Sequence, residues 1–378
     1  MARTASPPPR RKSTPDVFHR VQRTGGSSLT VTLPKSWLES MHVSSGDLVR
    51  LRNLGAGRLE VTPANPATRR VEEKVLSVEI HDSPPNLLSR LLVGAYVTGH
   101  DLIRLSAKGE FTEAQRQEIA RTVVRMLGIN VVEERRNLVE VQVFVDPARH
   151  SLPHLRDRVV RLLRAEITLC RSGIAGSGPP GIQELSRMEE EIDRIYLLMV
   201  RQLLLASDDF RIAQEIGLPS HHFQIGERLV SKILEMTGDL LFDTGRELFD
   251  TRTGLRRLSV AGRADLDRLF ERFDSLLART MDAFAHFSVE ETNATLNELL
   301  EELDRKPAFS RLLSRRYPDV PTGMLVQRIV SNLLTAWEML VAVNEVALNR
   351  FVEPERVGDL RPPERPLVLG SDPELAIN

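Results

Sequence analysis

The chain has 378 residues, a formal net charge of −1, 41% hydrophobic residues and 27% charged residues. This length predicts two or three domains, and the composition is that of a soluble protein able to bury a core. The single cysteine, Cys170, excludes an intrachain disulfide framework and any zinc site built from several thiolates.

Three features of the sequence predict a cytoplasmic location. Residues 1–16 lack the apolar core of a secretory signal. No apolar run approaches the roughly 18 residues of a membrane helix, and a lone cysteine fits a reducing compartment. We therefore expect no membrane insertion.

Positive charge is concentrated at the N-terminus. Residues 1–64 contain ten Lys or Arg and four Asp or Glu, so they carry a formal charge of +6 while the remainder carries −7. A basic head on an acidic body indicates a polyanionic partner for the head. Residues 1–15 are rich in Pro, Ser and Arg, and we expect them to form a disordered basic arm.

Short strands and turns are predicted over residues 16–64. Apolar residues alternate with hydroxyl residues along 28–33, which is the period of a half-buried strand, and 35–41 follow as a short helix. The alternation resumes on both sides of a glycine-containing turn at 55–57. About 50 residues in such short pieces bury little by themselves. The pattern therefore predicts a dimer that shares strands between two chains.

Basic side chains in this segment are candidate phosphate ligands. Arg50 and Arg52 alternate with Val49 and Leu51, so both arginines are expected to face away from the buried side. Phosphate contacts require Lys or Arg side chains gathered on one surface. The candidate DNA-binding residues are Arg20, Arg23, Lys35, Arg50 and Arg52.

A small α/β domain is predicted over residues 70–148. One apolar face indicates a helix at 84–97, and Thr112 is placed to cap a second helix that stops at Gly128. Strands are predicted at 101–105, 129–133 and 139–145. This segment contains no catalytic constellation.

Helices dominate the remainder of the chain. They are predicted at 152–172, 182–206, 220–248, 262–287, 289–304 and 322–351. The order repeats as three helices followed by three, which predicts two repeats at 150–258 and 259–352 and a tail at 353–378.

Two pairs of carboxylates stand out on the long helices. Glu189 and Asp193 are four residues apart and so project from one helical face, and Glu235 and Asp239 repeat the spacing. If the two helices are antiparallel neighbours, the pairs converge, and Gly238 permits close approach. Clustered carboxylates repel, and a hard divalent cation or iron relieves that repulsion. The alternative is a solvated acidic face, because such pairs are frequent on acidic helices.

Several motifs of the N-terminal segment occur together in a known family. VQRTGGSS at 21–28, TVTLPKSW at 30–37 and the Gly46-Asp47 pair resemble the AbrB/MazE/SpoVT domain, in the form found at the N-terminus of archaeal PhoU-like phosphate uptake regulators. The resemblance implies a swapped-hairpin β-barrel dimer that commonly binds DNA. Many DNA-binding relatives carry arginines after the Leu-Pro motif, where this chain has Leu38-Glu39.

The helical region resembles the PhoU part of the same regulators. Residues 182–205 and 229–242 are similar to the two signature helices of a PhoU repeat, and 91–105 resemble the linker region. The resemblance implies two three-helix bundles whose (E/D)xxxD motifs can bind metal clusters. The matching positions are Glu189 with Asp193 and Glu235 with Asp239; the second repeat keeps Glu338 but has Leu334 four residues earlier, with Glu298 and Glu302 as the nearest counterparts.

The predicted fold is therefore multidomain α+β. It comprises an AbrB-like swapped-hairpin β-barrel, a small α/β linker domain and a C-terminal all-α pair of PhoU-like three-helix bundles. The resemblance favours a homodimeric regulator of phosphate homeostasis that binds DNA, carries a divalent metal or iron, and docks on a phosphate transporter or phosphate-signalling protein.

Two other function classes compete with the regulator. One is a structural or adaptor protein in which the head only dimerises and the carboxylates are solvated. The other is a metal-dependent hydrolase, which is disfavoured because no nucleophile or general base accompanies the carboxylates. We expect no enzymatic activity.

Overall fold

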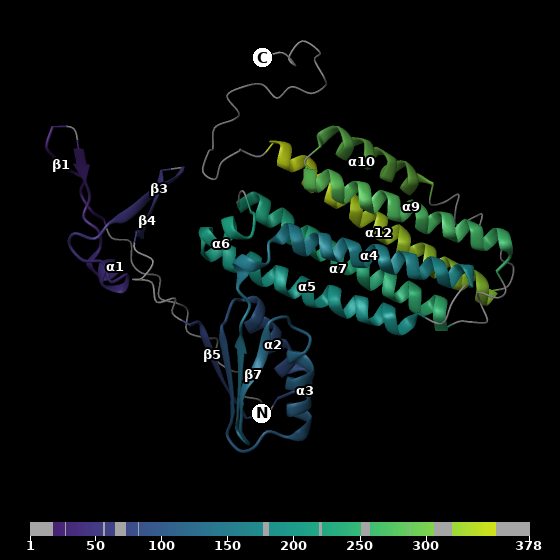
Figure 1. Ribbon diagram of the computed structural model, residues 1–378, viewed down its shortest axis with the longest axis horizontal. Helices are drawn as coiled ribbons and strands as arrows, with labels where there is room; N and C mark the ends of the chain where they lie inside the picture. The colour runs from purple at the N-terminus through teal and green to yellow at the C-terminus, as the bar shows by residue number, and fades with distance from the viewer. Residues whose placement is uncertain are drawn as a thin grey trace, which may run out of the picture. The chain divides into compact units, whose positions relative to one another are not determined.

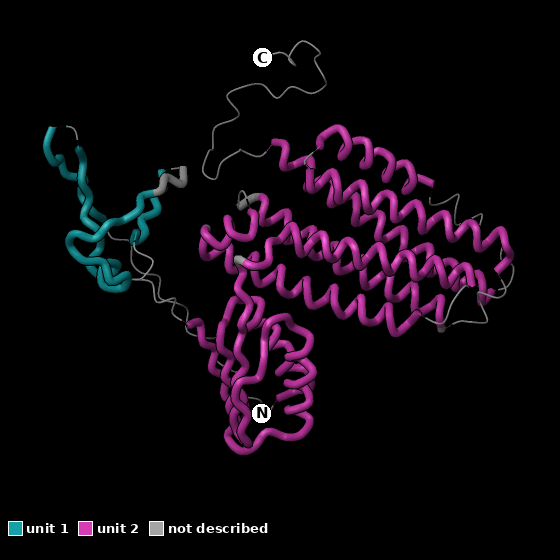
Figure 2. Tube along the Cα trace, in the orientation of Figure 1, with its two compact units in different colours: residues 1–72 teal, residues 73–378 magenta. Residues whose placement is uncertain are grey.

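The computed structural model describes residues 18–26, 28–55, 57–64, 73–81, 83–176, 181–218, 221–250, 258–286, 288–305 and 320–352. The chain divides into two compact units, residues 1–72 and 73–378 (Figure 2). The predicted basic arm at 1–15 and the predicted tail at 353–378 lie outside the described residues.

The first unit consists of two β-hairpins and one short helix (Figure 1). Strands β1 (Gln22–Thr24) and β2 (Ser28–Thr30) pair antiparallel, as do β3 (Val49–Gly55) and β4 (Arg58–Pro63). Helix α1 (Lys35–Ser40) follows Pro34 and confirms the helix predicted there. Strand β2 is shorter than predicted, because the paired ladder ends at Thr30.

Apolar side chains of this unit lie open to solvent. The exposed fractions of Leu29, Val31, Leu51 and Leu59 lie between 54% and 70%. None of the described residues of 18–64 whose burial is recorded belongs to the buried class. A single copy of the unit thus leaves uncovered the apolar faces that its strand periodicity creates.

The second unit begins with an α/β part that contains a four-stranded sheet. The strands are β5 (Val75–Ile80), β6 (Leu102–Ala107), β7 (Ile129–Glu134) and β8 (Leu138–Val143), in the order β5-β6-β8-β7. Strand β5 runs parallel to β6, whereas β8 is antiparallel to both of its neighbours. Strand β5 was not predicted, and the other three confirm the predicted strands to within a few residues.

Two helices of the α/β part pack on this sheet. Helix α2 (Leu87–Val97) buries Leu88, Leu92 and Tyr96, and helix α3 (Glu113–Val123) buries Ile119 and Val123; these residues form one core with Ile103, Leu105, Val139 and Val141 of the sheet. The Thr112 hydroxyl accepts a hydrogen bond from the Gln115 backbone N–H, and the Gln115 side chain accepts one from the Thr112 N–H. This capping box confirms the predicted start of α3.

A body of long helices follows (Figure 1). The helices are α4 (Leu152–Ala175), α5 (Ile182–Asp208), α6 (Phe210–Glu215), α7 (His221–Asp250), α9 (Val260–His286), α10 (Val289–Asp304) and α12 (Val320–Val352). Helices α4, α5 and α7 contact one another, as do α9, α10 and α12. Contacts of α4 with α9 and of α7 with α12 join the two groups around one shared hydrophobic core.

Helix α12 is the most apolar of the described long helices. An 18-residue window within it has a mean hydropathy of 1.2, so by length and composition alone it could cross a membrane. Charged residues such as Glu338 interrupt its apolar run, which is why no such window was predicted. Its side chains at Leu325, Ile329, Leu333 and Leu340 are buried in the shared core, as expected of a core helix.

Candidate functional site

Helices α5 and α7 run antiparallel at close range. The Gln224 amide donates a hydrogen bond to the Leu203 carbonyl at one end of the pair. Farther along, a Cβ at Gly238 would lie 3.2 Å from Ile192 Cδ1, tighter than ordinary van der Waals contact. The absence of a side chain at Gly238 therefore lets α5 approach α7, as the sequence predicted.

This approach gathers three of the four predicted metal-ligating residues. One carboxylate oxygen from each of Glu189, Asp193 and Asp239 lies within 4.8 Å of the others. Asp239 is exposed, and the other two are half-buried, so the group opens to solvent. We call Glu189, Asp193 and Asp239 the carboxylate triad.

The surroundings of the triad disfavour negative charge. Burial raises the pKa of Glu189 to about 7, and the neighbouring Asp193 and Asp239 add to the shift. Although its side chain reaches solvent, partial burial likewise raises the pKa of Asp239, with Asp193 as the next cause. Partial desolvation is thus a larger effect than mutual repulsion, and a bound cation would offset both.

A fourth carboxyl group lies behind the triad. Glu166 on α4 has no exposed surface, and neither of its carboxyl oxygens has a hydrogen-bond partner. Burial, together with the charges of Glu189 and Asp239, raises its pKa to about 9. An unpartnered buried carboxyl beside three others fits an oxygen-ligated cation.

The sequence held a signal for Glu166 that the spacing argument missed. Glu166 follows the buried Leu163 by three residues and precedes the buried Cys170 by four, so it lies on the apolar face of α4. A carboxyl group on such a face is unusual and requires a reason. Cys170 itself is fully buried and packs as a small hydrophobe on the same face.

Glu235 lies outside the triad. Its side chain is largely buried and forms an ion pair with Lys232, one turn earlier on α7. The Lys232 ammonium in turn lies 5.1 Å from the centre of the Tyr196 ring. The Glu235 carboxylate is therefore already neutralised by a neighbour on its own helix.

The second group of helices places its acidic residues among arginines. Glu298 pairs with both Arg272 and Arg279, and Glu302 lies 3.5 Å from Arg272 and 3.4 Å from Arg305. Arginines thus already neutralise the carboxylates of Glu298 and Glu302. Among the described residues, the triad is the one group of three or more His, Cys, Asp or Glu side chains whose ligand atoms lie close enough together to hold a metal ion.

The candidate DNA-binding residues lie in the first unit: Arg23 on β1, Arg50 and Arg52 on β3, Lys35 at the start of α1, and Arg20 just before β1. Arg20, Arg23 and Arg50 are exposed. Lys35 is also exposed and lies 3.7 Å from Glu39 on α1, so an acidic neighbour partly offsets its charge. For Arg52 the structure describes the backbone, which pairs with Glu60.

The β3–β4 hairpin separates polar from apolar residues. Arg50 pairs with Thr62 and Arg52 with Glu60, whereas Leu51 pairs with Val61. Because successive residues of a strand point to opposite faces, Arg50 and Arg52 share one face and Leu51 lies on the other. The hairpin therefore presents an apolar face and a polar face, which we call the basic face because its two arginines outnumber Glu60.

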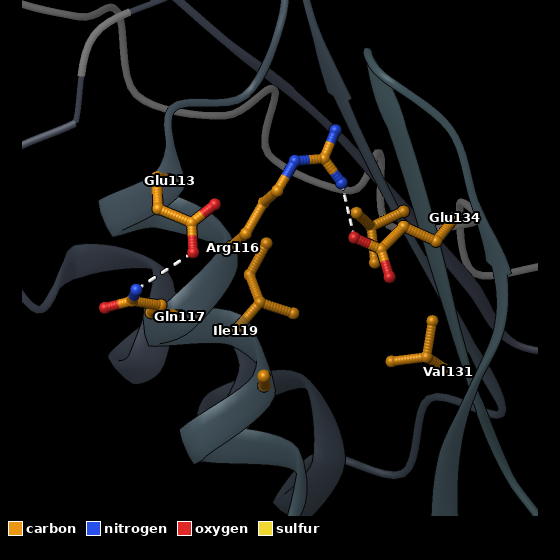
Figure 3. A pocket seen from close by; sticks show the side chains of 8 residues that line it. Glu113, Arg116, Gln117, Ile119, Val131 and Glu134 are labelled. Atoms are coloured by element: carbon orange, nitrogen blue, oxygen red, sulfur yellow. Dashed lines mark hydrogen bonds and ion pairs between the residues drawn. The ribbon is translucent and has the colours of Figure 1, made fainter.

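A groove of about 290 Å³ lies between α3 and the β7–β8 edge of the sheet (Figure 3). Apolar side chains, among them Ile119 and Val131, line it beneath a polar rim. In the rim, Arg116 pairs with Glu134 and the Gln117 amide donates to Glu113 (Figure 3). The rim side chains thus bond to one another, and we assign the groove no ligand.

Comparison with known proteins bears on the first unit alone. Residues 22–69 match the family model described as antidote-toxin recognition MazE, bacterial antitoxin. No curated protein and no solved structure matches the chain. The chain thus begins with a MazE/AbrB-type β domain. A mostly helical body follows this domain.

Proposed function

We propose that the protein is a non-enzymatic, DNA-binding regulator that dimerises through its first unit. The observation that carries this proposal is the amphipathic β3–β4 hairpin within the matched MazE-type segment. One face offers Arg50 for phosphate contacts, and the other offers Leu51 for a protein partner.

A second copy of the chain is the partner that best suits the apolar faces. Exposed leucines on both hairpins need a covering surface, and a small β unit gains its stability by burying such residues between chains. Each arginine then occurs twice in the assembly. Doubling the phosphate contacts makes DNA affinity depend steeply on salt.

Reversing the charge of Arg50 and Arg52 tests the DNA proposal. In a dimer, Arg50→Glu with Arg52→Glu removes about four phosphate contacts, each worth about 0.9 in the slope of log affinity against log salt. We expect affinity for genomic DNA fragments to fall more than about tenfold and the salt slope to flatten. Fluorescence anisotropy between low and moderate salt measures both quantities.

The matched control carries the same charge change on the second unit. Arg90→Glu with Arg121→Glu alters two exposed arginines of the α/β part and should leave DNA affinity close to that of the parent chain. Equal losses in both double variants would contradict a specific basic face. No DNA binding by a dimeric parent chain would instead favour the adaptor function, in which the head only dimerises.

We also propose that the carboxylate triad, with Glu166 behind it, holds a divalent metal or iron. The full chain with Glu189→Gln and Asp239→Asn should lose metal uptake, because two oxygen ligands are removed. Elemental analysis after incubation with Mn²⁺, Zn²⁺ or Fe²⁺ measures the content. Glu235→Gln is the control and should retain metal, since Lys232 already pairs with that carboxylate. Unchanged content in the double variant would refute the site.

The physiological role that we propose is control of phosphate uptake in the cytoplasm. Its support is the similarity of residues 182–205 and 229–242 to PhoU signature helices, and the partner would be a phosphate transporter or phosphate-signalling protein. Sequencing the DNA fragments that the protein retains tests the role. Enrichment of phosphate-transport genes supports it, and enrichment of unrelated genes contradicts it while leaving DNA binding intact.

A further inference from the structure

Two arginines join the α/β part to helix α5. The buried Arg201 guanidinium donates hydrogen bonds to the carbonyls of Tyr96 (2.6 Å) and His100 (2.9 Å) and to Asp101 (3.1 Å). The second arginine, Arg125, which follows α3, pairs with Asp193 of the carboxylate triad at 3.1 Å.

These contacts lie along one face of α5. Asp193, Leu197 and Arg201 are spaced four residues apart, so they form a stripe about 12 Å long. Leu197, in the middle, packs against the core of the α/β part. The stripe thus has a buried end at Arg201 and an exposed end at Asp193.

The exposed end belongs to two systems at once. Asp193 is a member of the triad and also the ion-pair partner of Arg125. Burial and the neighbouring acids raise the pKa of Glu189, and the charge of Arg125 opposes part of that rise. The guanidinium therefore acts as a monovalent counter-ion for at least two of the three acidic groups.

We propose that Arg125 competes with the bound cation, and that a divalent ion displaces it from Asp193. This inference rests on the metal site proposed above. Displacement leaves the α/β part attached at Leu197 and Arg201, with its outer contact open. Metal binding at the triad thereby frees the loop that joins α3 to β7 from α5.

The contact at the Asp193 end of the stripe is weaker than the contact at the Arg201 end. We therefore expect the Asp193 end to open first. The Arg125 side chain is 63% exposed, and an exposed ion pair contributes little to stability. Arg201 is 2% exposed and makes three hydrogen bonds. A divalent ion shared by several carboxylates can therefore break the outer contact while the inner one persists.

Arg125→Gln separates this proposal from the metal site itself. The variant removes the competing charge, so its affinity for Mn²⁺, Zn²⁺ or Fe²⁺, each tested alone by calorimetry, should rise about threefold. Arg121→Gln, an exposed arginine four residues earlier, removes the same charge without touching Asp193. That control should bind metal like the parent chain.

Hydrogen exchange of residues 120–128 gives the second readout. In the parent chain, metal should accelerate exchange there, whereas Arg125→Gln should exchange faster without metal and respond little to it. Equal metal affinities of the parent chain and Arg125→Gln, or exchange that metal leaves unchanged, would overturn the proposal while the metal site stands. If neither the parent chain nor Arg125→Gln bound any of the ions, the proposed metal site and the proposed competition would both be refuted.

Discussion

Replacing Glu166 with Gln is expected to make the stability of the protein less sensitive to rising pH. The carboxyl is fully buried without a partner, and its pKa is raised from 4.5 to about 9. Between these values the folded chain keeps a proton that the unfolded chain releases. The contribution of Glu166 to stability is therefore intact below pH 4.5 and is lost as pH rises toward 9.

The size of the stability change follows from the slope of the free energy of unfolding against pH. One such group lowers the free energy of unfolding by about 1.4 kcal/mol for each pH unit in the window. A neutral Gln has no such slope. The free energy of unfolding of Glu166→Gln, measured against that of the parent chain, should therefore rise by an amount on the order of 4 kcal/mol between pH 4 and pH 8. Urea unfolding between pH 4 and 9, with a chelator present, measures this.

Glu184→Gln is the matched control for the pH experiment. Glu184 is exposed in the first turn of α5, so its replacement should leave the pH profile parallel to that of the parent chain. If Glu166→Gln and the parent chain lost stability with pH at the same rate, the Glu166 carboxyl would have to be ionised in the folded state near neutral pH.

Arg201→Met is expected to destabilise the second unit by a free energy of unfolding on the order of 3 kcal/mol. Methionine fills a similar volume but donates no hydrogen bond, so the carbonyls of Tyr96 and His100 lose a buried donor. Asp101 loses its cation, and the same carboxylate also accepts the Lys74 backbone N–H at the start of β5. The damage should therefore reach the edge of the sheet.

The matched control for Arg201 is an arginine at the surface. Arg104 pairs with Glu140 on the open face of the sheet with 45% of its side chain exposed, so Arg104→Met should cost about 1 kcal/mol or less. Urea unfolding gives both values, and hydrogen exchange at residues 96–101 locates the effect. Similar losses in the two variants would show that burial of Arg201 carries no special weight.

Local patterns predicted the elements and part of the candidate site. The Thr112 cap and the four-residue spacing of Glu189 and Asp193 depend on neighbours in the sequence, and the structure places both as expected. Strand β5 was missed although Leu76, Val78 and Ile80 alternate with less buried residues. Its parallel pairing with β6 depends on a crossover through α2, which no local pattern encodes.

The remaining parts of the site depend on contacts distant in sequence. Arg125 and Asp193 are 68 residues apart, and Arg201 meets Tyr96 across 105 residues, so no spacing rule could pair them. Glu235 differs, because Lys232 three residues earlier was visible as a competing partner on the same helical face. A carboxylate is a good candidate metal ligand when no cationic side chain lies one turn away on the same helix to pair with it.

The single core that joins α4, α5 and α7 to α9, α10 and α12 has a consequence for how the body melts. Phe270 and Phe273 of α9 and Leu333 of α12 belong to the same buried cluster as Leu163 and Ile233 beside the carboxylate groups. Helices that share a packed interior usually unfold together. We therefore expect both groups of helices to melt in one transition, and binding energy gained at the first group should raise the melting temperature of the second.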